Sequence, residues 1–239
     1  MSGHNKWSTI KHRKGAQDAK RAKIFSRLSK NLIIAAQSGG SDPEMNATLK
    51  IAIDQARREN MPKDNIDRAI KRGSGEGAGE KIEEMIYEAY YPTQNENVAL
   101  LILCATDNTN RTVGEIKSEI KKGGGKFVPS GSVSFQFEHV GHIIVQSANQ
   151  EEIELAAIDA GALDVKHKDQ EILIITEPNK MHVIQKKLEG DSLTLLSATL
   201  TYMPKQPIIL SSEDQKKYEK FYEIIDDQDD VQKIYDNVE

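Results

Sequence analysis

Apolar residues recur every three or four positions in the first third of the chain, which is the spacing of one helix face. The pattern predicts a first helix from Ala16 to Gln37, ended by Ser38–Ser41. A second helix is expected after the start signal Asp42-Pro43 and should stop before Met61-Pro62. A third, short helix should end at Gly73. Together they predict a three-helix bundle behind an N-terminal tail.

A glycine-rich stretch, residues 74–79, follows the third helix. Its composition is that of a flexible linker, and the composition of the chain changes across it. It is not a phosphate-binding loop, because it follows a helix and no Gly-Lys-Ser/Thr comes after it. A domain boundary is therefore expected here.

Beyond the linker the periodicity becomes that of strands. Strands are expected at 86–91 and 98–105, then a helix carrying Val113, Ile116 and Ile120. The alternating residues at 133, 135 and 137 (Val, Phe and Phe) predict a further strand. This β-β-α-β piece lacks a second helix to cover its sheet.

Residues 141–203 predict a complete β-α-β-β-α-β unit, the order of the ferredoxin-like split motif. Its expected strands are 143–145, 163–167, 172–175 and 198–202, and its helices are 151–160 and 179–188. Ser212 with Gln215 resembles a capping box and should open a further helix, and a last short helix should follow Asp229-Asp230. These C-terminal helices would supply what the middle piece lacks.

The predicted fold class is therefore α+β with three domains, one of them discontinuous. The expected boundaries are 1–73 for the basic tail and three-helix bundle, 74–79 for the linker, 80–138 plus 205–239 for the discontinuous α+β domain, and 139–204 for the inserted ferredoxin-like domain.

Charge divides the chain at the same linker. Residues 1–79 hold 16 Lys and Arg against 8 Asp and Glu, a net of +8, and residues 80–239 carry −13. Residues 1–30 contain nine cations against Asp18 alone. A basic module on an acidic body is typical of proteins that bind a polyanion, because the rest of the surface repels phosphates.

Candidate nucleic-acid-binding residues gather in the tail and on the third helix. The cations would contact phosphates, while the rings of His4, Trp7 and His12 would stack on bases or sugars. The competing interpretation of Trp7 is an anchor that packs on the bundle. The candidates are His4, Lys6, Trp7, Lys11, His12, Arg13, Lys14, Lys20, Arg21, Lys23, Arg68, Lys71 and Arg72. A second group, Tyr87, Tyr90, Asn108 and Arg111, lies at predicted strand ends and is a candidate binding cleft.

A base-reading third helix has weaker support. The residues available to base edges, as in a helix-turn-helix, would be Asn65, Arg68, Lys71 and Arg72. The joint Asn60-Met61-Pro62, however, lacks the usual glycine of the tight turn. Binding through phosphates and shape, on DNA or on structured RNA, is therefore favoured.

Several segments resemble the signatures of the YebC/PmpR family. The two longest are Gly3–Lys14, followed by Lys23-Ile24-Phe25, and Asn60–Ile70. Shorter similarities are Thr106–Thr112, Gly131-Ser132-Val133 and Asp229–Gln232. The resemblance covers the whole chain and implies a three-domain α+β protein of the bacterial cytoplasm without known catalytic activity or cofactor. Two departures are Asn5, where a serine is usual, and residues 92–97, which replace a shorter glycine-rich turn.

The resemblance implies two functions that remain open here. One is DNA-binding regulation of transcription. The other is a ribosome-associated translation factor that binds ribosomal RNA and relieves stalling at difficult sequences such as proline runs; mitochondrial relatives activate translation. The second is mechanistically preferred, although the charge pattern fits DNA and ribosomal RNA about equally. Neither implies a membrane or a small-molecule substrate.

Enzymatic chemistry is a distant alternative. His139 and His142 flank a predicted turn without a cysteine nearby, so no zinc pattern is present. Cys104 lies in an apolar strand and is expected to be a buried small residue. The acidic run 226–230 is expected to cap the last helix and stay solvated. No apolar run approaches the ~18 residues of a membrane span, and no secretory signal is evident, so a cytoplasmic protein is expected.

Overall fold

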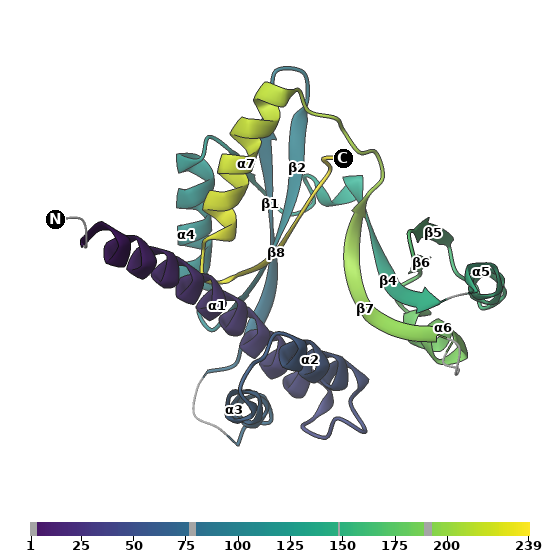
Figure 1. The fold of residues 1–239 in the computed structure, drawn as a ribbon. Coiled ribbons are helices and arrows are strands. Elements are labelled where there is room, and N and C mark those ends of the chain that lie inside the picture. The colour runs from purple at the N-terminus through teal and green to yellow at the C-terminus, as the bar shows by residue number, and fades with distance from the viewer. Residues whose placement is uncertain (1–3, 77–79, 148, 189–192) are drawn as a thin grey trace. The chain divides into compact units, whose positions relative to one another are not determined.

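The computed structural model describes residues 4–76, 80–147, 149–188 and 193–239, with side chains from Lys20 onward apart from that of Leu193. Within these ranges the protein is α+β, with a helical N-terminal part and two four-stranded sheets (Figure 1). The helices are α1 (His4–Gly39), α2 (Ala47–Arg58), α3 (Lys63–Gly73), α4 (Thr109–Lys122), α5 (Gln150–Asp159), α6 (Met181–Leu188) and α7 (Ser212–Asp226). The strands are β1 (Glu83–Pro92), β2 (Asn97–Thr106), β3 (Lys126–Val128), β4 (Phe137–Ser147), β5 (Asp164–Lys168), β6 (Glu171–Thr176), β7 (Leu193–Pro204) and β8 (Val231–Asp236), with a 3-10 turn η1 (Ser134–Gln136) before β4.

The chain forms two compact units, each built from separate stretches of sequence. The first comprises Met1–Tyr87, Ile102–Gly125 and Tyr218–Ile234. The second comprises Glu88–Leu101, Lys126–Lys217 and Tyr235–Glu239. The three-domain boundaries expected from the sequence stay a prediction beside this division.

The first helix is longer than expected, because α1 begins at His4 rather than Ala16 and leaves no extended tail over the described residues (Figure 1). Gly15 lowers helix propensity by about 1 kcal/mol, but the Lys, Arg and Ala residues around it favour a helix. The basic segment is therefore helical.

The second helix begins later than expected, at Ala47. Asn46 is its N-cap: the Leu49 N–H donates to Asn46 Oδ1 (3.0 Å), and Asn46 Nδ2 donates to Ala35 O (2.8 Å). The carboxylate of Asp42 instead accepts from the Glu44 N–H in a preceding turn (2.9 Å). Asn46 rather than Asp42 caps α2, because its amide side chain also bonds to α1 and so joins the two helices. The bundle core then forms around Leu28, Leu32, Leu49, Ala56 and Ile66.

The start of the predicted linker closes α3. Gly75 has φ 83°, and the Glu76 N–H reaches back to Lys71 O (3.0 Å), which is a glycine-terminated helix end. Residues 77–79, the remainder of the predicted linker, lie outside the described residues.

The first sheet has the order β3-β1-β2-β8. The strand expected at 133–137 is wrong, because residues 134–136 form η1 and β3 pairs with β1 (Glu88↔Val128) in its place. The buried Glu88 carboxylate accepts from the N–H groups of Gly131 (2.7 Å), Val133 (2.6 Å) and Ser134 (3.2 Å), which holds this segment in a turn.

The prediction of a last short helix is also wrong, since the residues after Asp229-Asp230 form strand β8. Its buried Val231, Ile234 and Tyr235 are β-branched or aromatic, and the strand joins the sheet beside β2. The C-terminal segment therefore completes the first sheet, although with a strand in addition to a helix. The cap of α7 is Ser211 rather than Ser212: Ser211 Oγ accepts from the N–H of Asp214 (3.1 Å).

The second sheet confirms the ferredoxin-like arrangement, with antiparallel strands in the order β5-β6-β4-β7. β4 lies at its centre and is longer than expected, because it pairs along its whole length with β7 from Phe137↔Pro204 to Ser147↔Leu193. β4 and β6 contribute fully buried side chains such as Ile143, Ile172 and Ile174.

Candidate nucleic-acid interface

Helix α1 carries ten of the candidate residues on one continuous element. His4, Lys6, Trp7, Lys11, His12, Arg13 and Lys14 lie on its N-terminal part, where the structure describes the backbone. Lys20 and Arg21 are exposed, and the Arg21 guanidinium lies over the Phe25 ring, 5.1 Å from its centroid. The helix thus holds these cations in a fixed spacing along its axis.

Farther along α1, cations bind the acidic run near the C-terminus. Lys23 Nζ lies 2.9 Å from Asp226 Oδ2 and 3.0 Å from Asp227 Oδ1. Arg27 Nη2 lies 2.7 Å from Asp226 Oδ1, and Arg27 Nε donates to Val231 O (2.9 Å). Burial alone would raise the pKa of Asp226, but hydrogen bonds from the two cations bring it below its usual value. Lys23 is therefore engaged within the protein.

Lys30 makes the next contact, with a carboxylate that is almost fully buried. Lys30 Nζ lies 2.7 Å from Asp230 Oδ1, and the other oxygen accepts from Thr112 Oγ1 (2.6 Å) and Arg111 Nη2 (3.2 Å). Burial alone would raise the pKa of Asp230, but these hydrogen bonds, with that of Lys30 the largest, lower it. We call Asp226, Asp227 and Asp230 the aspartate clamp. The expectation that this acidic run caps a last helix and stays solvated is wrong, because Asp226 and Asp230 receive cations from α1.

The candidates on α3 separate into two kinds. Arg68 and Lys71 are exposed. Arg72 is half-buried, donates to Glu80 O (3.1 Å) and lies 3.7 Å from an Asp107 oxygen. Arg72 therefore stabilises the first unit, while Arg68 and Lys71 face solvent.

The predicted cleft residues do not form one constellation. Tyr87 is buried in the first unit, where its hydroxyl donates to Met85 Sδ (3.4 Å). Asn108 caps α4, and Arg111 is held by Asp107 and Asp230. Tyr90, three residues after Tyr87 on β1, belongs to the second unit, and residues three apart on a strand face opposite sides.

Tyr90 lies at a separate cavity of about 680 Å³ within the second unit. Its hydroxyl donates to Ser132 O (3.0 Å) and accepts from Gln136 Nε2 (3.1 Å). Glu96 and Asn97, from the unusual 92–97 turn, also line this cavity.

The residues considered for catalysis or metal binding pack against other side chains. Cys104 is fully buried, and burial, followed by the charge of Asp230, raises the pKa of its thiol to about 12. The His139 ring stacks on Tyr202 with centroids 4.7 Å apart. No three His, Cys, Asp or Glu side chains are grouped to hold a metal among the described residues. Within the same part of the chain, no helix is both long and apolar enough to cross a membrane.

Sequence reasoning missed the clamp and one cavity between helices. The clamp joins residues about 200 positions apart, so no local pattern indicates it. The cavity lies between α2 and α3 and includes Lys63 and Asp67. Its signal was present, because Lys63, Asp67 and Lys71 recur every four residues and must share one face of a helix.

Comparison with known proteins identifies relatives along the whole chain. Residues 5–76 match the family described as TACO1/YebC protein N-terminal domain, and residues 82–238 match TACO1/YebC second and third domain. A probable transcriptional regulatory protein of Caldanaerobacter subterraneus subsp. tengcongensis is 44% identical, covering 100% of this chain and 98% of that protein. One from Thermotoga maritima is 45% identical, covering 100% and 94%. The crystal structure of a conserved hypothetical protein from Aquifex aeolicus superposes with a TM-score of 0.80 at 39% identity, covering 93% of this chain and 91% of that one.

Proposed function

Because the chain belongs to the TACO1/YebC family, we propose that it regulates gene expression by binding nucleic acid, without catalysing a reaction, and that the first half of α1 supplies the phosphate contacts. The regulatory role is the one that the names of its relatives carry. The nucleic-acid contact is inferred from the charge and geometry of α1.

The division of α1 into two halves is the observation that carries the proposal. Lys23, Arg27 and Lys30 in the second half are bound by the aspartate clamp, which fixes the helix to its own unit. The first half carries Lys6, Lys11, Arg13, Lys14, Lys20 and Arg21, with Asp18 as its only acid. The anchored cations orient the helix, and we propose that the cations of the first half contact a polyanion, whose counterions they would release.

Backbone spacing along α1 suits a regular phosphate chain. Positions 6, 13 and 20 recur every seven residues, close to two helical turns, and so lie along one line of the helix. Successive positions are about 10 Å apart on a 1.5 Å rise per residue. Lys, Arg and Lys occupy them.

Reading of a major groove by α3 has less support, although one argument against it no longer holds. Asn60 adopts φ 57° between α2 and α3, so it takes the left-handed conformation usually left to glycine in a tight turn. The solvent-facing side of α3 nevertheless includes Asp64 and Asp67, which would repel the phosphates that flank a groove. Binding through phosphate contacts and nucleic-acid shape is therefore more consistent with the charges of α3 than base reading in a major groove.

The test measures binding of the full chain to labelled duplex DNA and to structured ribosomal RNA across a salt series. The combined substitution Lys11→Gln, Arg13→Gln and Lys14→Gln should reduce the logarithmic salt slope by about 2 to 3, because each lost duplex phosphate contact removes about 0.9. A matched variant loses the same charge in the second unit, through Lys168→Gln, Lys186→Gln and Lys187→Gln, and should change the slope little.

Equal salt slopes for the two triple variants would refute the role of α1. Co-sedimentation with ribosomes at physiological salt separates the two regulatory settings. Retention on ribosomes with weak, sequence-independent DNA binding supports action in translation. A sequence-specific footprint on duplex DNA without ribosome binding supports action in transcription.

A further inference from the structure

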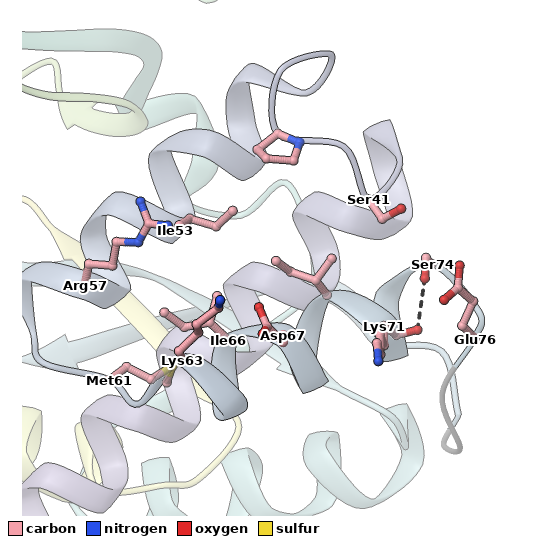
Figure 2. A pocket seen from close by; sticks show the side chains of 12 residues that line it. Ser41, Ile53, Arg57, Met61, Lys63, Ile66, Asp67, Lys71, Ser74 and Glu76 are labelled. Atoms are coloured by element: carbon pink, nitrogen blue, oxygen red, sulfur yellow. Dashed lines mark hydrogen bonds between the residues drawn. The ribbon is translucent and has the colours of Figure 1, made fainter.

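A cavity of about 530 Å³ opens between α2, α3 and the loop that precedes α2, entirely within the first unit (Figure 2). Five of its twelve lining residues belong to Asn60–Ile70, the segment that carries the second family resemblance. The proposed role of α1 does not use this segment. The volume lies in the range of small-ligand sites.

The floor of the cavity is apolar. Ile53 from α2 and Met61 from the joint are 7% and 5% exposed, and Ile66 from α3 is 5% exposed. Ile70 lies one turn beyond Ile66 on the same face of α3. A flat, weakly polar group such as a nucleobase would bury its face here.

Charged side chains surround this floor. Figure 2 shows Asp67 between Lys63 and Lys71 along α3, with Arg57 reaching in from α2. Arg57 has an ion-pair partner in Asp54 at 3.6 Å. Lys63, Asp67 and Lys71 have the four-residue spacing that favours ion pairs, yet none of them forms one within 4.0 Å in the part of the chain that the structure describes.

We propose that this cavity binds one unstacked nucleotide of a single-stranded nucleic acid. The base packs on the apolar floor, Asp67 accepts hydrogen bonds from its edge, and Arg57, Lys63 and Lys71 bind the neighbouring phosphates. The proposal rests on the function proposed above, in which α1 supplies phosphate contacts, and adds a second site that recognises a base.

The position of Asp67 decides the class of ligand. The Asp67 carboxylate lines the cavity between Lys63 and Lys71 and repels a phosphate, so its neighbourhood suits a base and the three cations suit the flanking phosphates. An acidic peptide would place its own carboxylates against Asp67 and Glu76, which line the same cavity. In a duplex the Watson–Crick edge that would donate to Asp67 is occupied by the paired base, and the base face is stacked, so a single strand is required.

The same carboxylate selects among bases. An ionised Asp only accepts hydrogen bonds. Guanine presents two adjacent donors, N1–H and the N2 amino group, so it can satisfy both oxygens of Asp67. Adenine and cytosine offer one amino group, and uracil offers one N–H between two carbonyl oxygens, which the carboxylate repels. The expected order is guanine first and uracil last.

The experiment uses the full chain and four labelled uridine decamers that differ only at the sixth base, which is G, A, C or U. Fluorescence anisotropy should give about tenfold tighter binding for central guanine than for uracil, the lower part of the range for a bidentate base contact. Asp67→Asn should reduce this ratio to below about threefold, because its amide offers uracil a donor and guanine only one acceptor. Asp64→Asn, an exposed site on the same helix outside the cavity, is the matched control and should keep the wild-type ratio.

Two outcomes overturn the proposal. One is equal binding of the four decamers by the wild type, and the other is an unchanged guanine preference in Asp67→Asn. In either case, retained salt-dependent binding that the α1 triple variant weakens leaves the proposed function standing. Circular dichroism of each variant verifies that the bundle is folded.

Discussion

Replacement of Asp230 by alanine should loosen the contact between α1, α4 and β8. The Asp230 side chain is 7% exposed, and its carboxylate accepts hydrogen bonds from Lys30 Nζ (2.7 Å), Arg111 Nη2 (3.2 Å) and Thr112 Oγ1 (2.6 Å). Its removal leaves the Lys30 ammonium, itself 15% exposed, with one remaining acceptor among the described residues, Asp229 O at 3.0 Å. Loss of one partner of a buried pair costs about 3 to 5 kcal/mol. The lower end applies because Arg111 is 46% exposed and regains water.

Local hydrogen exchange is the suitable assay, because a protein with two units need not unfold in one step. A loss of about 3 kcal/mol corresponds to exchange on the order of 100-fold faster. The amide of Ala105, which donates to Asp230 O at 2.9 Å, and the amides of α4 should report it. Asp229→Ala is the matched control, because the exposed Asp229 contributes only its carbonyl to Lys30. Its effect should stay below about threefold.

The reasoning fails if Asp230→Ala accelerates exchange no more than Asp229→Ala does. A double-mutant cycle isolates the ion pair itself. Lys30→Met should cost clearly less in the Asp230→Ala background than in the wild type, and equal costs in both backgrounds would show that the pair carries no coupling.

Three further predictions concern packing, reactivity and pH. Gly73→Ala should lower the free energy of unfolding by about 1 to 3 kcal/mol, because its methyl group would lie 2.5 Å from Ile33 O. Gly114→Ala should raise it by about 0.5 to 1 kcal/mol, because Gly114 has open space around it in helix α4 and alanine favours a helix. Urea titrations of both variants measure the two changes. Iodoacetamide at pH 8 should leave Cys104 unmodified in the folded chain and alkylate it in urea, since its pKa of about 12 leaves almost no thiolate; rapid native labelling would contradict its burial. The lowered pKa of Asp226 means that its contribution to stability is complete above about pH 4, its unfolded pKa, and is lost as pH falls through the folded value, so Asp226→Asn should flatten the acid side of the urea-midpoint profile. An acid profile identical to that of the wild type would exclude this contribution.

Elements with strong local patterns followed from the sequence. The apolar run of β2 and the complete ferredoxin-like order from β4 to β7 were predicted, because each has its own periodicity and turn residues. The errors lie where distant contacts decide. The strand expected around Phe135 is a turn because the carboxylate of Glu88 binds its backbone, and the residues after Asp230 form a strand because they pair beside β2.

The candidate site divides in the same way. The clustered cations of the first half of α1 are visible in the sequence without a fold, and their role in binding stays a prediction. The sequence could not separate Lys20, which is exposed, from Lys23, which binds Asp226 from the far end of the chain. The prediction that Tyr87 and Tyr90 share one cleft is wrong, because the three-residue step along β1 turns their side chains to opposite faces.

The aspartate clamp also sets the order in which the protein can be completed during its own synthesis. The hydrogen bonds from Lys23, Arg27 and Lys30 to the C-terminal run span 199 to 204 residues. At about 5 to 20 residues per second, the helix is made some 10 to 40 s before the carboxylates that neutralise it. Apart from Ile82 and Ala105, the core of the three-helix bundle lies within the first third of the chain, so the bundle can form early. Throughout that interval α1 carries its full positive charge beside the RNA of the ribosome that is making it, so the helix meets a polyanion before it meets its own aspartates.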